Sequence, residues 1–147
     1  MRNAELDRLV MQYGVEATIE LIKRETSGRA SESTLTIIAN QGTHHLPDAY
    51  KRGEIFVATK GNLDFSSVER VKSQYEKVIV ELSQKLKSNS WKTIYLVPFG
   101  HSTLCMQIKL LVYRVTRIET IDLFYDGKGG YADLSIEQRG LIIETDS

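Results

Sequence analysis

The sequence predicts an α/β fold: a three-layer sandwich with a mainly parallel sheet, an antiparallel C-terminal hairpin and an N-terminal helical element. Two observations support this. Apolar, β-branched runs of strand length recur along the chain, and amphipathic stretches of helical length lie between them. The order strand, helix, strand also occurs twice, which is typical of a sheet whose strands are joined by crossover helices.

Residues 1–30 are expected to form a helical element that serves assembly, followed by a domain over residues 31–147. Between Asn3 and Arg24, apolar side chains recur at helical spacing. Gly14 costs a helix about 1 kcal/mol relative to alanine, so one long helix and two short ones both remain open. The small, polar stretch from Glu25 to Ser33 is typical of a linker. The apolar stripe consists of Leu6, Leu9, Val10, Tyr13, Ala17 and Leu21.

Two strands and a long helix follow the linker. The strands are expected at Thr34–Ala39 and Glu54–Ala58, and both are nearly continuous apolar runs. The connection between them is at the lower limit for a parallel crossover, so their relative direction stays open. Ser66 and Glu69 form a capping-box pattern that predicts a helix start. The apolar stripe of this helix consists of Val68, Val71, Tyr75, Val78, Ile79, Leu82 and Leu86.

The stretch from Trp91 to Tyr131 continues with a strand, a loop and a helix. The strand is expected at Lys92–Val97, and Pro98 ends it because proline lacks the backbone donor. A helix is expected from Ser102 or Thr103, with a hydroxyl side chain at the N-cap.

The C-terminal part is predicted to be mostly strand. A strand at Glu119–Tyr125 leads through the glycine-rich turn Asp126–Gly130 into a second strand at Tyr131–Ile136. Residues Glu137–Gly140 are expected to turn, and Leu141–Glu144 to form a short edge strand. The hairpin is the antiparallel part of the sheet.

Two polar loops are expected to meet at one edge of the sheet. One follows the strand ending at Ala39, the other follows the strand ending at Val97, and right-handed crossovers bring the two together if the strands are parallel neighbours. A helix start beside such loops directs unpaired N–H groups and a positive dipole end toward a ligand, which favours anions and nucleotides. The candidate ligand-binding residues are Gln41, Gly42, Thr43, His44, Phe99, Gly100, His101, Ser102, Thr103, Lys128 and Tyr131.

Other interpretations of these residues remain open. His44, His45 and Asp48, with His101 and Cys105, have side chains that can bind zinc or transfer protons, although adjacent histidines in an extended loop point apart. The loop around His101 is equally compatible with a well-capped turn. The turn around Lys128 is compatible with a plain hairpin, and Tyr125 or Tyr131 could stack on a base.

Composition narrows the function further. The 147 residues include 19 basic and 19 acidic side chains, so no net field favours duplex nucleic acid. A single cysteine, no apolar run of membrane-spanning length and a polar start predict a cytoplasmic protein that does not enter membranes. Walker, dinucleotide, α/β-hydrolase, zincin and C-x-x-C motifs are absent, and no cofactor is predicted.

The stretch beginning at Trp91 resembles the core motif of SAVED domains and, more distantly, of CARF domains, which are Rossmann-like sensors of cyclic oligonucleotides in bacterial antiphage defence. The matching segments are Ile94–Gly100, His101–Met106, Ile121–Tyr125 and Tyr131, preceded by a long helix and a tryptophan. The resemblance implies a Rossmann-like domain that binds a cyclic oligonucleotide. It covers about a third of the chain well.

The resemblance also implies partners. SAVED domains usually contain two such halves and a fused effector, whereas this chain has room for one half. A homodimer or higher homo-oligomer is therefore expected, acting as a sponge, as a sensor for a separate effector protein, or as a metal-independent ring nuclease that uses His101, His44 and Lys128. The alternative from another class is a histidine- or metal-dependent enzyme acting on a small nucleotide or nucleobase.

Overall fold

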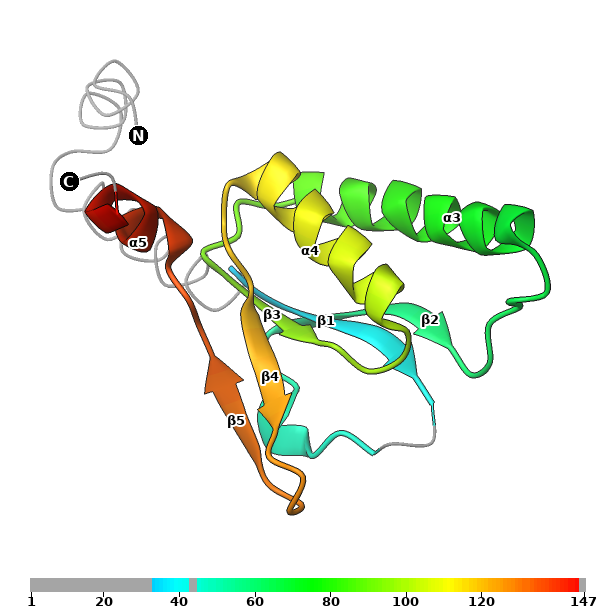
Figure 1. Cartoon of the computed structure of the whole chain (residues 1–147), viewed down its shortest axis with the longest axis horizontal. Helices are drawn as coiled ribbons and strands as arrows, with labels where there is room; N and C mark the ends of the chain where they lie inside the picture. Colours follow the sequence, from blue (N-terminus) through cyan, green and yellow to red (C-terminus); the bar gives the residue numbers. More distant parts are fainter. Residues whose placement is uncertain (1–32, 43–44, 146–147) are drawn as a thin grey trace, which may run out of the picture. The chain divides into compact units, whose positions relative to one another are not determined.

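The chain forms a five-stranded sheet in the order β2-β1-β3-β4-β5 (Figure 1). The structure is a computed structural model that describes residues 33–42 and 45–145. Strands β1 to β4 pair in parallel, and β5 pairs antiparallel with β4. The predicted α/β class, Rossmann-like with a mainly parallel sheet and a C-terminal antiparallel hairpin, is confirmed. The strands are β1 (Thr34–Gln41), β2 (Glu54–Lys60), β3 (Thr93–Val97), β4 (Ile121–Tyr125) and β5 (Tyr131–Leu134).

Helices α3 (Val68–Lys87) and α4 (Ser102–Thr116) cover one face of the sheet (Figure 1). Their apolar stripes meet alternate side chains of β1 and β3 in one core, because successive residues of a strand point to opposite faces. Each large side chain buried there stabilises the fold by about 1.5–3 kcal/mol. The fully buried side chains of this core include Leu35, Ile37, Leu82, Ile94, Leu104, Ile108 and Val112.

The connection between β1 and β2 forms the layer on the opposite face. It contains the short 3₁₀ helix η1 (Asp48–Tyr50), and its buried Leu46 packs with Ile38 and Val97. The chain steps from β1 to β2 in one direction across the sheet and from β2 to β3 to β4 in the other. Right-handed crossovers therefore require the two sets of connections to lie on opposite faces.

Both helix starts differ from those predicted. Helix α3 is capped by Ser67, whose Oγ accepts from the Arg70 N–H at 3.2 Å. The capping box predicted at Ser66 is wrong by one residue, because the Ser66 N–H donates to Asp64 Oδ1 at 2.9 Å in the preceding turn. The N-cap of α4 is His101, which makes no side-chain cap bond, so the predicted hydroxyl cap is also wrong.

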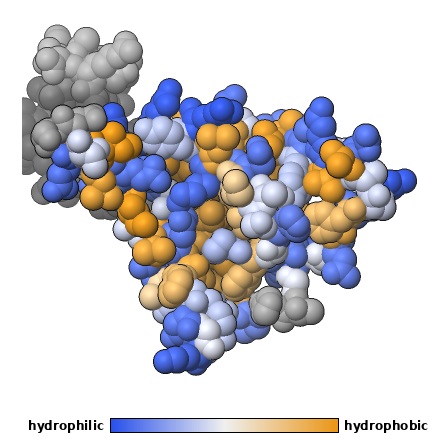
Figure 2. Space-filling view, viewed as in Figure 1, coloured by the Kyte–Doolittle hydropathy of each residue, from blue (hydrophilic) through white to orange (hydrophobic). Residues whose placement is uncertain are grey.

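The C-terminal residues form a helix, α5 (Gln138–Thr145), where the sequence predicted a turn over Glu137–Gly140 and an edge strand at Leu141–Glu144. Three consecutive apolar residues carry neither the period of a strand nor that of a helix, so the pattern did not discriminate. No residue of α5 is buried. Figure 2 shows apolar side chains along β5 and α5, and the exposed ones are Leu134, Ile136, Leu141, Ile142 and Ile143.

The predicted N-terminal helical element, residues 1–30, lies outside the described residues. Within residues 33–42 and 45–145, no helix is both long enough and apolar enough to span a bilayer.

Candidate functional site

The carboxyl ends of β1 and β3 are adjacent, and the chain leaves them in opposite directions. After β1 it passes to the face of η1, and after β3 it enters α4 on the other face. Such a divergence leaves a crevice beyond the strand ends, and open α/β sheets bind their ligands there. The predicted meeting of the two loops is confirmed, because β1 and β3 pair in parallel.

Asn40 and Gly100 make the closest approach between these two loops. Gly100 has a φ of +96°, and a Cβ placed on it would lie 2.7 Å from Asn40 Cβ. The Asn40 side chain also joins the ends of β1 and β2: its Nδ2 donates to the Gly61 carbonyl at 3.0 Å, and its Oδ1 accepts from the Thr59 hydroxyl at 3.0 Å. A glycine at position 100 thus allows three strand ends to be held together.

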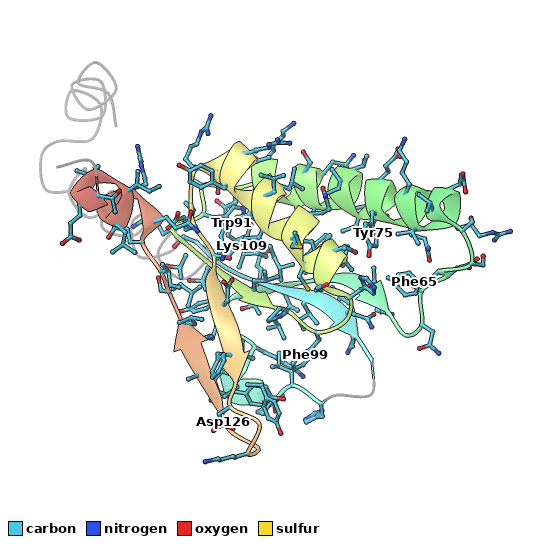
Figure 3. The ribbon with its side chains drawn as sticks, in the orientation of Figure 1. Phe65, Tyr75, Trp91, Phe99, Lys109 and Asp126 are labelled. Carbon is cyan, nitrogen blue, oxygen red and sulfur yellow. The ribbon has the colours of Figure 1, made fainter. Side chains whose placement is uncertain are left out.

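Described residues of this edge line three hollows, and Phe99, which is labelled in Figure 3, lines all of them. The amide hollow, about 570 Å³, is lined by Asn40, Gln41, Gly42, Gly61, Asn62, Phe99 and Gly100. The cationic hollow, about 230 Å³, is lined by Ile38, Gln41, Gly42, His45, Leu46, Lys51 and Phe99. The aromatic hollow, about 400 Å³, is lined by Pro98, Phe99, Gly100, Tyr125, Gly129 and Tyr131.

The amide hollow is electrically neutral. Three of its lining residues are glycines, which let a ligand approach the backbone closely. The side-chain amides of Gln41 and Asn62 each offer donors and an acceptor. This lining suits a polar group such as a base edge or a ribose.

The cationic hollow carries Lys51 and His45. Lys51 Nζ lies 3.4 Å from Asp48 Oδ1, but the Asp48 side chain is 92% exposed, so this ion pair is weak. None of the described residues that line this hollow is acidic. An anionic group can therefore compete with Asp48 for the ammonium.

The aromatic hollow is built by the β4–β5 hairpin and the loop after β3. The ring of Tyr131 lies 6.2 Å from that of Phe99 and 5.2 Å from that of Tyr125, both tilted. The hairpin turn is held internally: Asp126 Oδ1 accepts from the N–H groups of Lys128 and Gly130, at 2.7 and 3.0 Å. The Asp126 side chain thus serves the turn, which lies at the tip of the hairpin in Figure 3.

Arg52 ties the β1–β2 connection to the hairpin. Its guanidinium donates to both carboxylate oxygens of Asp133, at 2.7 and 2.8 Å, and lies 3.5 Å from the ring centroid of Tyr95. The hydrogen bonds from Arg52 lower the pKa of the Asp133 carboxyl, and the same contact raises the pKa of Arg52. The Arg52 backbone is fixed as well, because the buried Thr36 hydroxyl donates to its carbonyl at 2.6 Å.

Replacing Asp133 with asparagine should lower the free energy of unfolding by about 1 kcal/mol at pH 7, since the pair is bidentate but partly exposed. The pKa of Asp133 is lower in the folded protein than in the unfolded protein, where it is about 3.9. The ion pair therefore stabilises the fold fully above the unfolded-state pKa, and this contribution is lost as the pH falls through the folded-state pKa. The difference between wild type and variant should therefore shrink between pH 5 and pH 3. Urea unfolding at several pH values measures it.

The matched control is Asp48→Asn, whose side chain is 92% exposed. Its free energy of unfolding should stay within about 0.5 kcal/mol of wild type at every pH. An equal loss for Asp133→Asn at pH 7 and pH 3 would mean that the ion pair does not contribute.

The start of α4 is organised around Thr103. Its hydroxyl lies 2.8 Å from His101 Nδ1 and 2.7 Å from the Tyr75 hydroxyl, and the His101 ring lies 4.8 Å from the exposed ring of Phe65. Phe65 and Tyr75 are visible beside the start of α4 in Figure 3. His101 is thus oriented with Nε2 outward, but it lines none of the three hollows.

The structure brings together five of the predicted ligand-binding residues. Thr43 and His44 lie outside the described residues. His101, Ser102 and Thr103 begin α4 beside the hollows, and Lys128 lies exposed in the hairpin turn; none of these four lines a hollow. The residues that line a hollow are Gln41, Gly42, Phe99, Gly100 and Tyr131.

Sequence reasoning missed several lining residues. Gly61 and Asn62 follow β2, and they would have been expected at the same edge had the parallel direction of β2 been known. No sequence pattern predicted that Lys51 lies at this edge, because its position depends on how the β1–β2 connection folds back over the sheet.

A metal centre finds no support in the part of the chain that the structure describes. There, no three His, Cys, Asp or Glu side chains lie close enough together to hold a metal ion. Burial raises the pKa of the Cys105 thiol, which packs against the helical core. That thiol is therefore protonated at neutral pH and acts as a small apolar group.

Comparisons of the chain with protein-family models, with curated proteins and with solved structures found no match. Fold and geometry define the class: a Rossmann-like α/β domain whose sheet edge has polar and aromatic hollows at the topological switch point.

Proposed function

We propose that this chain binds a cyclic oligonucleotide second messenger along the carboxyl edge of its sheet. The observation that carries the proposal is the position of three adjoining hollows where β1 and β3 diverge. Nucleotides bind at such points in open α/β sheets, and hollows of this size are typical of small-molecule sites.

The chemistry of the lining supports a nucleotide over a purely apolar or purely anionic ligand. Neutral amides complement the edges of bases, and Lys51 complements a phosphodiester. The exposed ring of Tyr125 and the half-buried rings of Phe99 and Tyr131 complement the faces of bases. The resemblance of the stretch after Trp91 to SAVED and CARF domains supplies the ligand class. The proposed roles are those of a sensor or a sponge, and the proposal extends to cleavage of the ring.

A second copy of the chain belongs to the proposal. All three hollows open along the edge, and the SAVED resemblance accounts for only one half of a two-half site. A second copy would complete the cover of the ligand. A separate effector protein would then respond to the complex if the protein is a sensor.

Calorimetry of the full chain with cyclic di-, tri- and tetranucleotides of adenine and guanine tests the proposal, with chromatography of the ligand afterwards. Recovery of intact ligand supports a binder, and a linear product supports a ring nuclease. No heat with any member of the panel would overturn the proposal and favour the alternative, an enzyme acting on a small nucleotide or nucleobase. Light scattering with and without ligand reports the number of copies.

Replacing Gln41 with alanine should weaken binding about fivefold, because its amide lines two hollows and one neutral hydrogen bond contributes about 1 kcal/mol. Gln107→Ala, on the exposed face of α4, is the matched control and should bind like wild type.

His101→Ala should also weaken binding and leave the fold intact. Wild-type affinity for His101→Ala would confine the ligand to the three hollows.

A further inference from the structure

We infer that the two ends of this edge bind different parts of the ligand. A base stacks in the aromatic hollow, and a phosphodiester lies in the cationic hollow at the other side of Phe99. The inference rests on the proposed function, because it assigns the parts of that ligand to parts of the site. It also names the residues, Tyr125 and Lys51, that distinguish the two ends.

The aromatic hollow has the features of a base slot. Pro98, Phe99, Tyr125 and Tyr131 supply flat apolar surface, two glycines leave the backbone open, and no charged side chain lines it. Tyr125 is 52% exposed, and its hydroxyl accepts from the Gly129 N–H at 3.2 Å. That hydrogen bond holds the ring in position, which lowers the entropic cost of stacking a base against it.

The cationic hollow has the features of an anion subsite. It is the smallest of the three, it holds Lys51 and His45, and none of the lining side chains that the structure describes is acidic. Asp48 pairs only weakly with the Lys51 ammonium, because the two atoms lie 3.4 Å apart and the Asp48 side chain is 92% exposed. A phosphodiester carries one negative charge, shared over its two non-bridging oxygens, and can compete with Asp48 for this ammonium.

One short segment fixes the spacing between the two ends. The Tyr50 hydroxyl donates to the Tyr131 carbonyl at 3.0 Å, and the Arg52 guanidinium holds Asp133 of the same strand. Lys51, the residue between them, lines the cationic hollow. The segment that presents the cation is therefore anchored on both sides to the hairpin that builds the base slot.

Phe99 lies at the junction of the two ends. It lines all three hollows, and its ring contacts Tyr131. The amide hollow, which it shares with Gly100, then takes the sugar and the base edges between the two ends.

Binding of the same cyclic di-, tri- and tetranucleotides of adenine and guanine, measured at several salt concentrations, separates the ends. Tyr125→Leu should lower the affinity about tenfold and leave its salt dependence unchanged, because stacking involves no charge. Lys51→Gln should lower the affinity about fivefold at low salt and flatten the salt dependence, because a screened charge pair is lost. Asp48→Asn, which removes the competing carboxylate, should raise the affinity.

Matched variants keep the test specific. Tyr125→Phe retains the ring but loses the hydroxyl that holds it, so its affinity should lie between those of wild type and Tyr125→Leu. Lys92→Gln, at an exposed position before β3, should leave both affinity and salt dependence unchanged. Thermal unfolding verifies that each variant is folded. The inference is overturned if Tyr125→Leu binds like wild type, if it changes the salt dependence, or if Lys51→Gln and Lys92→Gln behave alike while the wild type binds. Absence of binding by the wild type overturns the proposed function and this inference with it.

Discussion

Replacing Gly53 with alanine should lower the free energy of unfolding by about 3 kcal/mol, the largest loss we expect from a single methyl group in this chain. Gly53 has a φ of +66°, and a Cβ placed there would collide with the Thr34 carbonyl group, 2.7 Å from its carbon. The obstacle is backbone at the start of β1, so it cannot rotate away. Urea unfolding followed by the fluorescence of Trp91, the single tryptophan, measures the loss.

Gly61→Ala is the matched control. Gly61 has the same φ of +66°, but a Cβ there would meet no heavy atom within 4 Å. Gly61→Ala should lower the free energy of unfolding by about 1 kcal/mol, because only the positive φ opposes the alanine. Equal losses for the two variants would show that the collision with Thr34 is relieved by a small backbone movement.

Replacing Gly100 with alanine should damage both stability and ligand binding. The new Cβ would lie 2.7 Å from Asn40 Cβ at a φ of +96°, so either the loop or Asn40 must move. Movement of Asn40 breaks its bonds to Gly61 and Thr59 and reshapes the amide hollow. We expect a loss of about 2 kcal/mol in unfolding free energy and an affinity at least about tenfold lower.

Gly127→Ala separates the loss of stability from the loss of affinity. Gly127 also has a positive φ, +79°, but a Cβ there would meet nothing within 4 Å, and the residue lines none of the three hollows. It should cost about 1 kcal/mol of stability and leave affinity unchanged. Wild-type affinity for Gly100→Ala would move the ligand away from the junction of the two loops. Calorimetry with the same cyclic oligonucleotides measures both variants.

The elements of the sheet and the long helix could be predicted because local pattern controls them. The apolar runs that form β1 and β3 are buried on both faces. A continuous apolar run of this kind can be recognised as a strand without knowing which strands lie beside it. The stripe ending at Leu86 has the helical period throughout, so α3 could not be taken for a strand. Where the pattern lacked a period, as at Leu141–Ile143, the prediction of a strand was wrong and the chain forms α5.

Helix starts were less predictable for a physical reason. Several adjacent side chains could cap α3 and α4, and the choice depends on which of them has another partner. Both the hydroxyl and the backbone N–H of Ser66 are engaged by Asp64, so Ser67 caps α3. Thr103 is engaged by Tyr75 and His101, and His101 takes the N-cap position of α4 without a cap bond of its own.

The sequence by itself determined that polar loops follow two buried strands, and that one of these loops leads into a helix. It also determined five of the residues that line the hollows. Only the tertiary structure decided that β2 runs parallel to β1 and that the connection between them lies on the opposite face from α3 and α4. These two choices bring Asn62 and Lys51 to the edge. A hollow is formed by segments far apart in the chain, so its lining depends on the order and direction of the strands, which local sequence does not encode.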